Sequence, residues 1–273
     1  MADPDDPLVR IAAALERLCP PPLRPADPLA HPAYVWDGQT LAPARHFAPL
    51  PLGLLLGVDT QKAALLATLA RLGAGQASHD VLLWGAKGSG KSALVKSAVA
   101  SVQAKCGALA LVDVAADAMS GLPRLFAQLD GAGRGFAVFL DDLGFDTPGE
   151  ARALRSLLEG GAEARPANVR LVVTANRRHL LPRDPGAESA AANPRDAADD
   201  ALALADRFGL SLGFPVIDQD MYLAIIASYA AHHALAFDAG DALLWARQRG
   251  SRSGRVAWHY VVELAGRAGQ SLG

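Results

Sequence analysis

Short apolar runs alternate with amphipathic stretches along the middle of the chain. Five runs of mainly apolar residues are bounded by turn residues, at 81–84, 108–114, 136–140, 169–174 and 210–214. Stretches with the helical spacing of apolar positions flank them, at 61–72, 91–105, 122–129, 150–158 and 198–208. Continuous apolar strands separated by helices are typical of a parallel sheet that is covered on both faces. The pattern therefore predicts an α/β fold with an open sheet.

The N-terminal region has a different pattern. Residues 1–50 hold ten of the eighteen prolines, which leaves room for one regular element, a short helix at about 8–18. We expect 20–32 to be extended or irregular, and the aromatic pair Tyr34 and Trp36 to dock this arm on the main body. A small arm that binds a partner is a sharper interpretation of the same composition.

The C-terminal region is helical throughout. After Pro215 the pattern predicts helices at 218–232, 239–249 and 254–270, which would form a small all-α unit. The stretch 182–200 is rich in Ala, Asp and Pro without an apolar period, and it predicts a mobile loop. The predicted organisation is a proline-rich arm at 1–50, an α/β unit at 51–216 and a helical unit at 217–273.

Composition narrows the class of protein. The 273 residues carry 26 basic and 28 acidic side chains, a net charge of −2, and 51% of them are hydrophobic. This balance excludes a disordered tail protein and a highly basic coating protein. Cys19 and Cys106 are too few for a disulfide framework, and neither has metal-binding neighbours in the sequence. The acidic N-terminus and the lack of an apolar run of about 18 residues lead us to expect a cytoplasmic protein without a membrane partner.

One glycine-rich segment has a phosphate-binding pattern. It fits GxxxxGK[ST] and stands between the run 81–84 and the helix from 91, as its mechanism requires. Its residues are Gly85, Ala86, Lys87, Gly88, Ser89, Gly90, Lys91 and Ser92. Glycines let backbone N–H groups converge on phosphate oxygens, and the start of the helix adds its positive end. Lys91 would reach the β- and γ-phosphates of ATP and Ser92 would hold Mg²⁺; an incidental glycine-rich turn is the alternative.

Polar residues follow two later strands. The run 136–140 ends in Asp141 and Asp142, and Asn176 follows the run 169–174. Ligands of open α/β sheets bind at the carboxyl edge of the strands. Asp141 would hold Mg²⁺, largely through water, and Asp142 would orient and activate the attacking water. Asn176 could contact the γ-phosphate or that water. An acidic pair that caps a helix and a turn asparagine are the structural alternatives.

Together these motifs resemble the AAA+ superfamily of P-loop ATPases. Several strings are similar to an uncharacterised bacterial AAA+ family that is defined only as a domain of unknown function. They lie at 82–92, 141–143, 157–161, 166–169, 175–180, 206–210 and 253–257. The resemblance covers about residues 50–270. It implies a five-stranded parallel sheet in the order 5-1-4-3-2, a helical lid, and nucleotide bound between lid and sheet, often at a subunit boundary.

The resemblance also implies roles for single residues. Asn176 matches sensor 1, and Arg207, just before the last strand, resembles the arginine finger that a subunit offers to its neighbour's γ-phosphate. Arg255 resembles the sensor 2 arginine, which closes the lid on the phosphates. Val58 lies in the segment that resembles the one packing over the adenine.

Two departures from the superfamily bear on function. Asp142 stands where Glu is commoner and is one methylene shorter, which predicts slow hydrolysis. The segment 115–121 lacks the aromatic-apolar-Gly signature of a pore loop that threads protein, which disfavours an unfoldase. The leading hypothesis is an ATPase that hydrolyses ATP with Mg²⁺, assembles as a homo-oligomer on nucleotide binding, and remodels or regulates an unidentified protein client. Its catalytic residues would be Lys91, Asp142, Asn176 and Arg207.

Two other functions remain open at this point. The first is a DNA-associated AAA+ ATPase of the initiator or helicase-loader type. The net charge disfavours it, but five arginines could form a phosphate-binding patch: Arg177, Arg178, Arg247, Arg249 and Arg252. The second is a nucleotide-gated switch, which binds ATP and changes partner affinity with little turnover.

Overall fold

The computed structural model of the chain describes residues 26–115, 117–143, 165–176 and 207–272, together with the short pieces 7–8, 10–11 and 157–158. The predicted loop at 182–200 lies outside these residues, as do Arg177 and Arg178. Most of the helices predicted at 8–18, 150–158 and 198–208 lies outside them as well.

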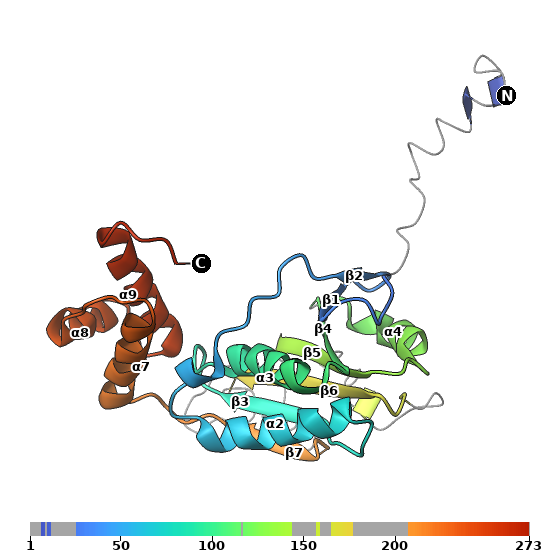
Figure 1. The fold of residues 1–273 in the computed structure, drawn as a ribbon, viewed down its shortest axis with the longest axis horizontal. Helices are drawn as coiled ribbons and strands as arrows, with labels where there is room; N and C mark the ends of the chain where they lie inside the picture. The colour runs from blue at the N-terminus through green and yellow to red at the C-terminus, as the bar shows by residue number, and fades with distance from the viewer. Residues whose placement is uncertain are drawn as a thin grey trace, which may run out of the picture.

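A seven-stranded sheet forms the centre of the described α/β part (Figure 1). Its strands are β1 (Ala33–Trp36), β2 (Leu41–Pro43), β3 (Val81–Gly85), β4 (Leu109–Val114), β5 (Gly135–Leu143), β6 (Val169–Asn176) and β7 (Leu210–Gly213). They lie in the order β2-β1-β4-β5-β6-β3-β7, and all neighbours are parallel except β1 and β2.

The sheet differs from the prediction at the β4 edge. Residues 33–43 of the arm form the hairpin β1–β2 beside β4. The prediction that the sheet has five strands was therefore wrong, and so was the prediction that the arm holds one regular element. Pro43 stands at the end of the edge strand, where the ladder does not need its missing N–H, so the proline content did not prevent pairing. The five predicted strands adjoin one another in the order β7-β3-β6-β5-β4.

Helices cover both faces of the sheet. They are α2 (Asp59–Gly73), α3 (Lys91–Cys106) and α4 (Leu122–Leu129), with the short 3₁₀ helices η1 (Leu52–Leu54) and η2 (Met119–Gly121). The core on one face lies under α2 and α3, and the core on the other lies under α4. Alternate residues of β5 point into the two cores. Phe136 and Val138 face the core under α4, and Ala137 and Phe139 face the core under α2 and α3.

The arm docks on the sheet through its aromatic pair, as predicted. Tyr34 and Trp36 are fully buried. The Tyr34 hydroxyl donates to the carbonyl oxygen of Asp27 (2.7 Å) and accepts the N–H of His31 (2.8 Å). Arg134 donates from the loop before β5 to the carbonyl oxygen of His31 (2.7 Å). These bonds fix the part of the arm from residue 26 onward.

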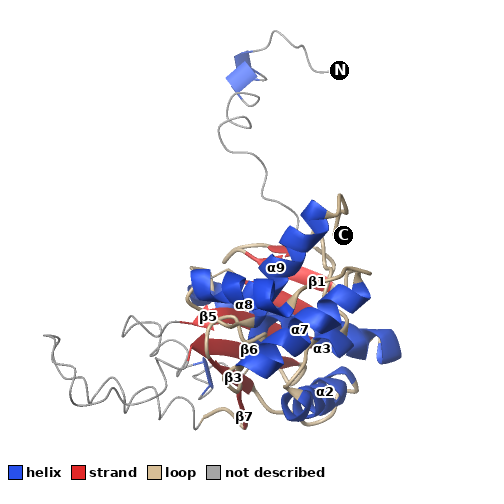
Figure 2. Cartoon of the chain, turned by 90° about the vertical axis from the view of Figure 1, so that its left-hand side faces the viewer, coloured by secondary structure: helices blue, strands red, loops and turns tan. Residues whose placement is uncertain are grey.

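The last three helices form a core of their own and are called the lid helices below: α7 (Gln219–His232), α8 (Ala239–Gln248) and α9 (Gly254–Arg267). Each begins with a side-chain cap, because Asp218, Asp238 and Ser253 each accept a backbone N–H three residues ahead. Figure 1 shows the lid helices on the left of the α/β part, and Figure 2 shows them in front of the strands. They therefore stand at one end of the sheet.

Candidate active site

The predicted phosphate loop connects β3 with α3. Gly85, Gly88 and Gly90 have positive φ angles of 152°, 78° and 94°, which residues other than glycine rarely adopt. Helix α3 begins at Lys91 without a side-chain cap among the described residues, so the N–H groups of its first turn are available. This end of the helix is suited to binding an anion.

Lys91 lies within this loop. It is 7% exposed, and its ammonium group donates to the carbonyl oxygens of Ala86 (2.9 Å) and Gly85 (3.1 Å). Burial lowers the pKa of Lys91 from its ordinary value, although the carboxylates of Asp142 and Asp141 act in the opposite direction. A bound phosphate would offer the ammonium charged acceptors, which make stronger hydrogen bonds than neutral carbonyl oxygens.

Ser92 and Asp141 meet at the first turn of α3. The Ser92 hydroxyl donates to Oδ1 of Asp141 (2.6 Å), and the Thr174 hydroxyl donates to the same oxygen (2.6 Å). Hydroxyl and carboxylate oxygens are the hard ligands that Mg²⁺ prefers, usually together with phosphate oxygens and water. The donor set therefore fits Mg²⁺. Within the described ranges, no group of three His, Cys, Asp or Glu side chains offers another metal site.

Asp142 and Asn176 form the next contact along the edge of the sheet. The Asn176 side-chain N–H₂ donates to Oδ1 of Asp142 (2.8 Å). Asp142 has a φ of 53°, a left-handed conformation that is uncommon for residues other than glycine. Oδ1 of Asn176 is buried and has no hydrogen-bond partner in the described part of the chain. The pair thus brings a strained backbone and an unpaired acceptor to one place, as active sites often do.

A cavity of about 680 Å³ between the sheet and the lid helices brings most of the predicted site residues together. Its polar part is lined by residues 87–92 of the phosphate loop, by Asp141, Asp142 and Asn176, and by Arg255 of α9. Its apolar part is lined by Val58, Leu54, Met221, Tyr229 and Trp258, among others. A cavity with a cationic, glycine-rich end and an apolar end has the chemistry that the phosphates and base of a nucleotide require.

The lid helices touch the phosphate loop directly. A Cβ atom on Gly88 would lie 2.9 Å from Oγ of Ser253 and 3.0 Å from its Cβ. Ser253 is the residue that caps α9, since its Oγ accepts the N–H of Val256 (3.2 Å). This contact places Arg255, in the first turn of α9, beside the loop.

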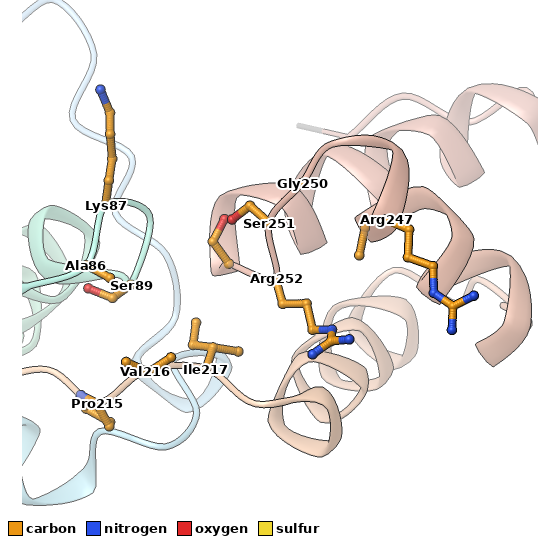
Figure 3. Close-up of a pocket in the computed structure, with 12 residues that line it drawn as sticks. Ala86, Lys87, Ser89, Pro215, Val216, Ile217, Arg247, Gly250, Ser251 and Arg252 are labelled. Atoms are coloured by element: carbon orange, nitrogen blue, oxygen red, sulfur yellow. The ribbon is translucent and has the colours of Figure 1, made fainter.

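A second cavity, of about 420 Å³, adjoins the first and shares with it Lys87, Ser89 and the connection 215–217. Figure 3 shows it between Ala86 and Ser89, the connection 215–217, and the loop between α8 and α9. In this view the charged ends of Lys87 and Arg247 point away from each other. Lys87 and Arg247 therefore do not converge on one anion in this cavity.

Arg207 lies at the opposite end of the strands. It lines a third cavity, of about 570 Å³, together with Asp80 and Arg165, which form an ion pair. Asp80 precedes β3, and Arg207 precedes β7. The structure therefore does not bring Arg207 to the cleft of its own chain, whose residues stand at the carboxyl ends of the strands.

Comparisons with known proteins place the chain in a family. Residues 29–268 match the family described as "Protein of unknown function (DUF815)". The chain belongs to the DUF815 family. A comparison with curated proteins finds no match.

Solved structures resemble the fold of this DUF815 protein. The Aeropyrum pernix ORC2 protein, solved as ADPNP and ADP complexes, is 17% identical with a TM-score of 0.54, over 84% of this chain and 68% of that one. The ORC1 protein of the same organism, solved in complex with DNA, is 19% identical with a TM-score of 0.52, over 79% and 64%. The RuvB Holliday junction branch migration motor of Thermotoga maritima is 18% identical with a TM-score of 0.50, over 77% of this chain. The DUF815 chain spans 62% of the RuvB chain. The shared fold is that of AAA+ P-loop proteins.

The structure of the DUF815 protein adds residues that the motifs alone did not indicate. Thr174 contacts both acidic residues, and the only sign of it in the sequence is a hydroxyl residue that follows the apolar run Leu171–Val173. Trp258 and Met221 line the apolar part of the cleft, and the sequence around them predicts only a helix. In the described part of the chain, no helix has the length and apolar character needed to cross a membrane.

Proposed function

We propose that this DUF815 protein binds ATP with Mg²⁺ in the cleft between sheet and lid and hydrolyses it. The observation that carries the proposal is the single cavity that gathers the phosphate loop, Asp141, Asp142, Asn176 and Arg255. The base would occupy the apolar part of the cavity beside Val58, and the phosphates would lie along the loop. Mg²⁺, held by Ser92 and Asp141, would neutralise charge on the phosphate oxygens.

The residues of the chain would act by positioning and by stabilising charge. Lys91 exchanges its two carbonyl acceptors for the terminal phosphates, where charge develops in the transition state. Asp142 and Asn176, which contact each other, would orient the attacking water, and the carboxylate of Asp142 would accept its proton. Arg255 reaches the phosphates from the lid, so lid closure and phosphate contact are coupled.

Assembly into a homo-oligomer is the second part of the proposal. Because Arg207 lies far from its own cleft, it would act on the γ-phosphate held by a neighbouring copy. Lid and subunit motions would then pass to a protein client whose identity is open. The likeness to RuvB and ORC is one of fold, and the role proposed for Arg207 rests on its place just before β7.

The test is steady-state ATP hydrolysis with Mg²⁺ across protein concentration, beside a mass measurement with and without ATP. Turnover per chain should rise as oligomers form. Arg207→Ala should keep ATP affinity and lose turnover, whereas Arg124→Ala, which removes an exposed arginine of α4, should change neither. Full turnover in Arg207→Ala would refute the role in the neighbour's site.

A nucleotide-gated switch is the second candidate, and one contact favours it. Asp142 is short for the role of general base, and its carboxylate is engaged by Asn176. A protein of this kind would bind ATP tightly and show flat, negligible turnover at every protein concentration. If the same experiment gave that result, the function would be nucleotide-gated switching and not ATP hydrolysis.

A DNA-associated ATPase is the third candidate. Arg247, Arg249 and Arg252 are exposed at the end of α8 and in the loop that follows, and the Arg249 guanidinium lies over the ring of Trp245 (3.2 Å to its centroid). The net charge of −2 disfavours it. Retention on DNA that weakens as salt rises would support this function, and no retention at low salt would refute it.

A further inference from the structure

The two strands that carry the acidic pair and Asn176 change register where the acidic pair stands. β5 and β6 pair residue by residue up to Leu140 and Val173, and pairing resumes at Leu143 and Ala175. Asp141 and Asp142 together therefore face a single residue, Thr174. Two residues opposite one form a β-bulge, which is rare between parallel strands and leaves backbone groups of the bulged strand without ladder partners.

Thr174 replaces the partner that the bulge removes. Its Oγ1 accepts the backbone N–H of Asp142 (2.7 Å) and donates to Oδ1 of Asp141 (2.6 Å). A hydroxyl has one hydrogen, so its donor bond goes to Asp141 while its lone pair serves Asp142. Thr174 is 1% exposed, and water does not compete for either bond.

We propose that Thr174 is a positioning residue of the ATPase site, which sets the place of both carboxylates through one hydroxyl group. Towards Asp141, it keeps the oxygen that also meets Ser92 in a fixed orientation. Towards Asp142, it holds the backbone at the φ of 53° from which the side chain reaches Asn176. This inference rests on the proposed function, because the site that Thr174 would order is the site for ATP and Mg²⁺.

A threonine that served only to pack the strand would respond differently to substitution than one that positions the two carboxylates. Threonine is common in strands because its branched side chain packs well, and valine has the same shape. If packing were the whole role, Thr174→Val would leave the site unchanged. If the hydroxyl matters, Thr174→Ser should keep function, and Thr174→Val should leave the Asp142 N–H buried without a partner.

The experiment compares Thr174→Val, Thr174→Ser and the control Thr68→Val, which alters another buried threonine, in α2. ATP affinity is measured with a fluorescent ATP analogue, with and without Mg²⁺, and kcat is measured separately. Thr174→Val should keep its affinity without Mg²⁺, lose most of the gain that Mg²⁺ brings, and lose about tenfold to a hundredfold in kcat. Thr174→Ser and Thr68→Val should stay within roughly threefold of the wild type.

The outcomes separate this inference from the proposed function. Wild-type kcat and Mg²⁺ gain in Thr174→Val, or an equal loss in Thr174→Ser, would overturn the role of the hydroxyl. A wild-type protein that does not bind ATP would overturn the proposed function, and the inference with it. Should Thr174→Val not fold, hydrogen exchange in the wild type decides: a protected Asp142 amide supports the inference, and exchange at the rate of an exposed amide overturns it.

Discussion

The contact between the lid helices and the phosphate loop can be tested by adding one methyl group. Gly88→Ala places a Cβ 2.9 Å from Oγ of Ser253, on a backbone with a φ of +78°. The left-handed conformation costs an alanine about 1–2 kcal/mol. The contact pushes Ser253 away from its place as the cap of α9, and loss of such a cap costs about 1 kcal/mol. The free energy of unfolding should therefore fall by about 2–3 kcal/mol.

Gly75→Ala is the matched control. Gly75 has a φ of +68°, and a Cβ there would meet nothing within 4 Å, so this variant has the backbone cost alone. Thermal unfolding followed by circular dichroism should place the Tm of Gly88→Ala about 2–4 °C below that of Gly75→Ala, since the extra cost is about 1 kcal/mol. Adding Ser253→Gly to Gly88→Ala removes the obstructing side chain and should recover part of this difference. Equal Tm values for Gly88→Ala and Gly75→Ala would show that the lid does not rest on the loop in solution.

Three further predictions concern the arm, the lid and the second face of the sheet. Arg134→Leu removes the donor that holds the arm, so the amides of residues 26–32 should exchange about tenfold faster or more by mass spectrometry. Burial, and then its hydrogen bond to Asp241, raises the pKa of Tyr260 to about 12. Its contribution to stability is complete below pH 10 and is lost between pH 10 and 12, and an absorbance titration should include a tyrosine that ionises near pH 12. Gly121→Ala would drive its Cβ into the carbonyl oxygen of Gly38, and chemical denaturation should show a loss of about 1–3 kcal/mol.

Each of these predictions has a control. Arg124→Leu should leave the exchange of the arm as in the wild type. Tyr260→Phe should reduce the late part of the titration by one tyrosine, and an unchanged titration curve would contradict its assignment. Gly133→Ala adds a Cβ that meets nothing within 4 Å, so a loss as large as that of Gly121→Ala would show that the close approach is not the cause.

The sequence was most informative where structure follows from local pattern. The phosphate loop, the strands before and after it, and the acidic pair at the end of β5 could all be placed, because each depends on neighbouring residues. The hairpin β1–β2 could not be placed. The prolines of the surrounding arm predicted irregular chain, and its partner β4 lies more than 70 residues further on, beyond the reach of any periodicity.

Within the site, the contacts that the sequence could not predict depend on the register between neighbouring strands. Nothing in the alternation of β5 or β6 shows that Asp141 and Asp142 share one opposite residue, so the role of Thr174 became visible only in the ladder. Arg207 was found by resemblance to a motif, but its distance from the cleft of its own chain is set by the topology of the whole sheet.

The hairpin β1–β2 also covers a strand edge through which other chains could pair by their backbones. β4 has buried apolar residues along its length, and without the hairpin its backbone N–H and C=O groups would form an open edge, a template on which other chains can pair. The hairpin covers this edge, and the strand that it exposes instead has only three residues and ends in Pro43. A chain shortened to begin at residue 51 would keep the phosphate loop and the cleft residues of the sheet, but it should aggregate through β4.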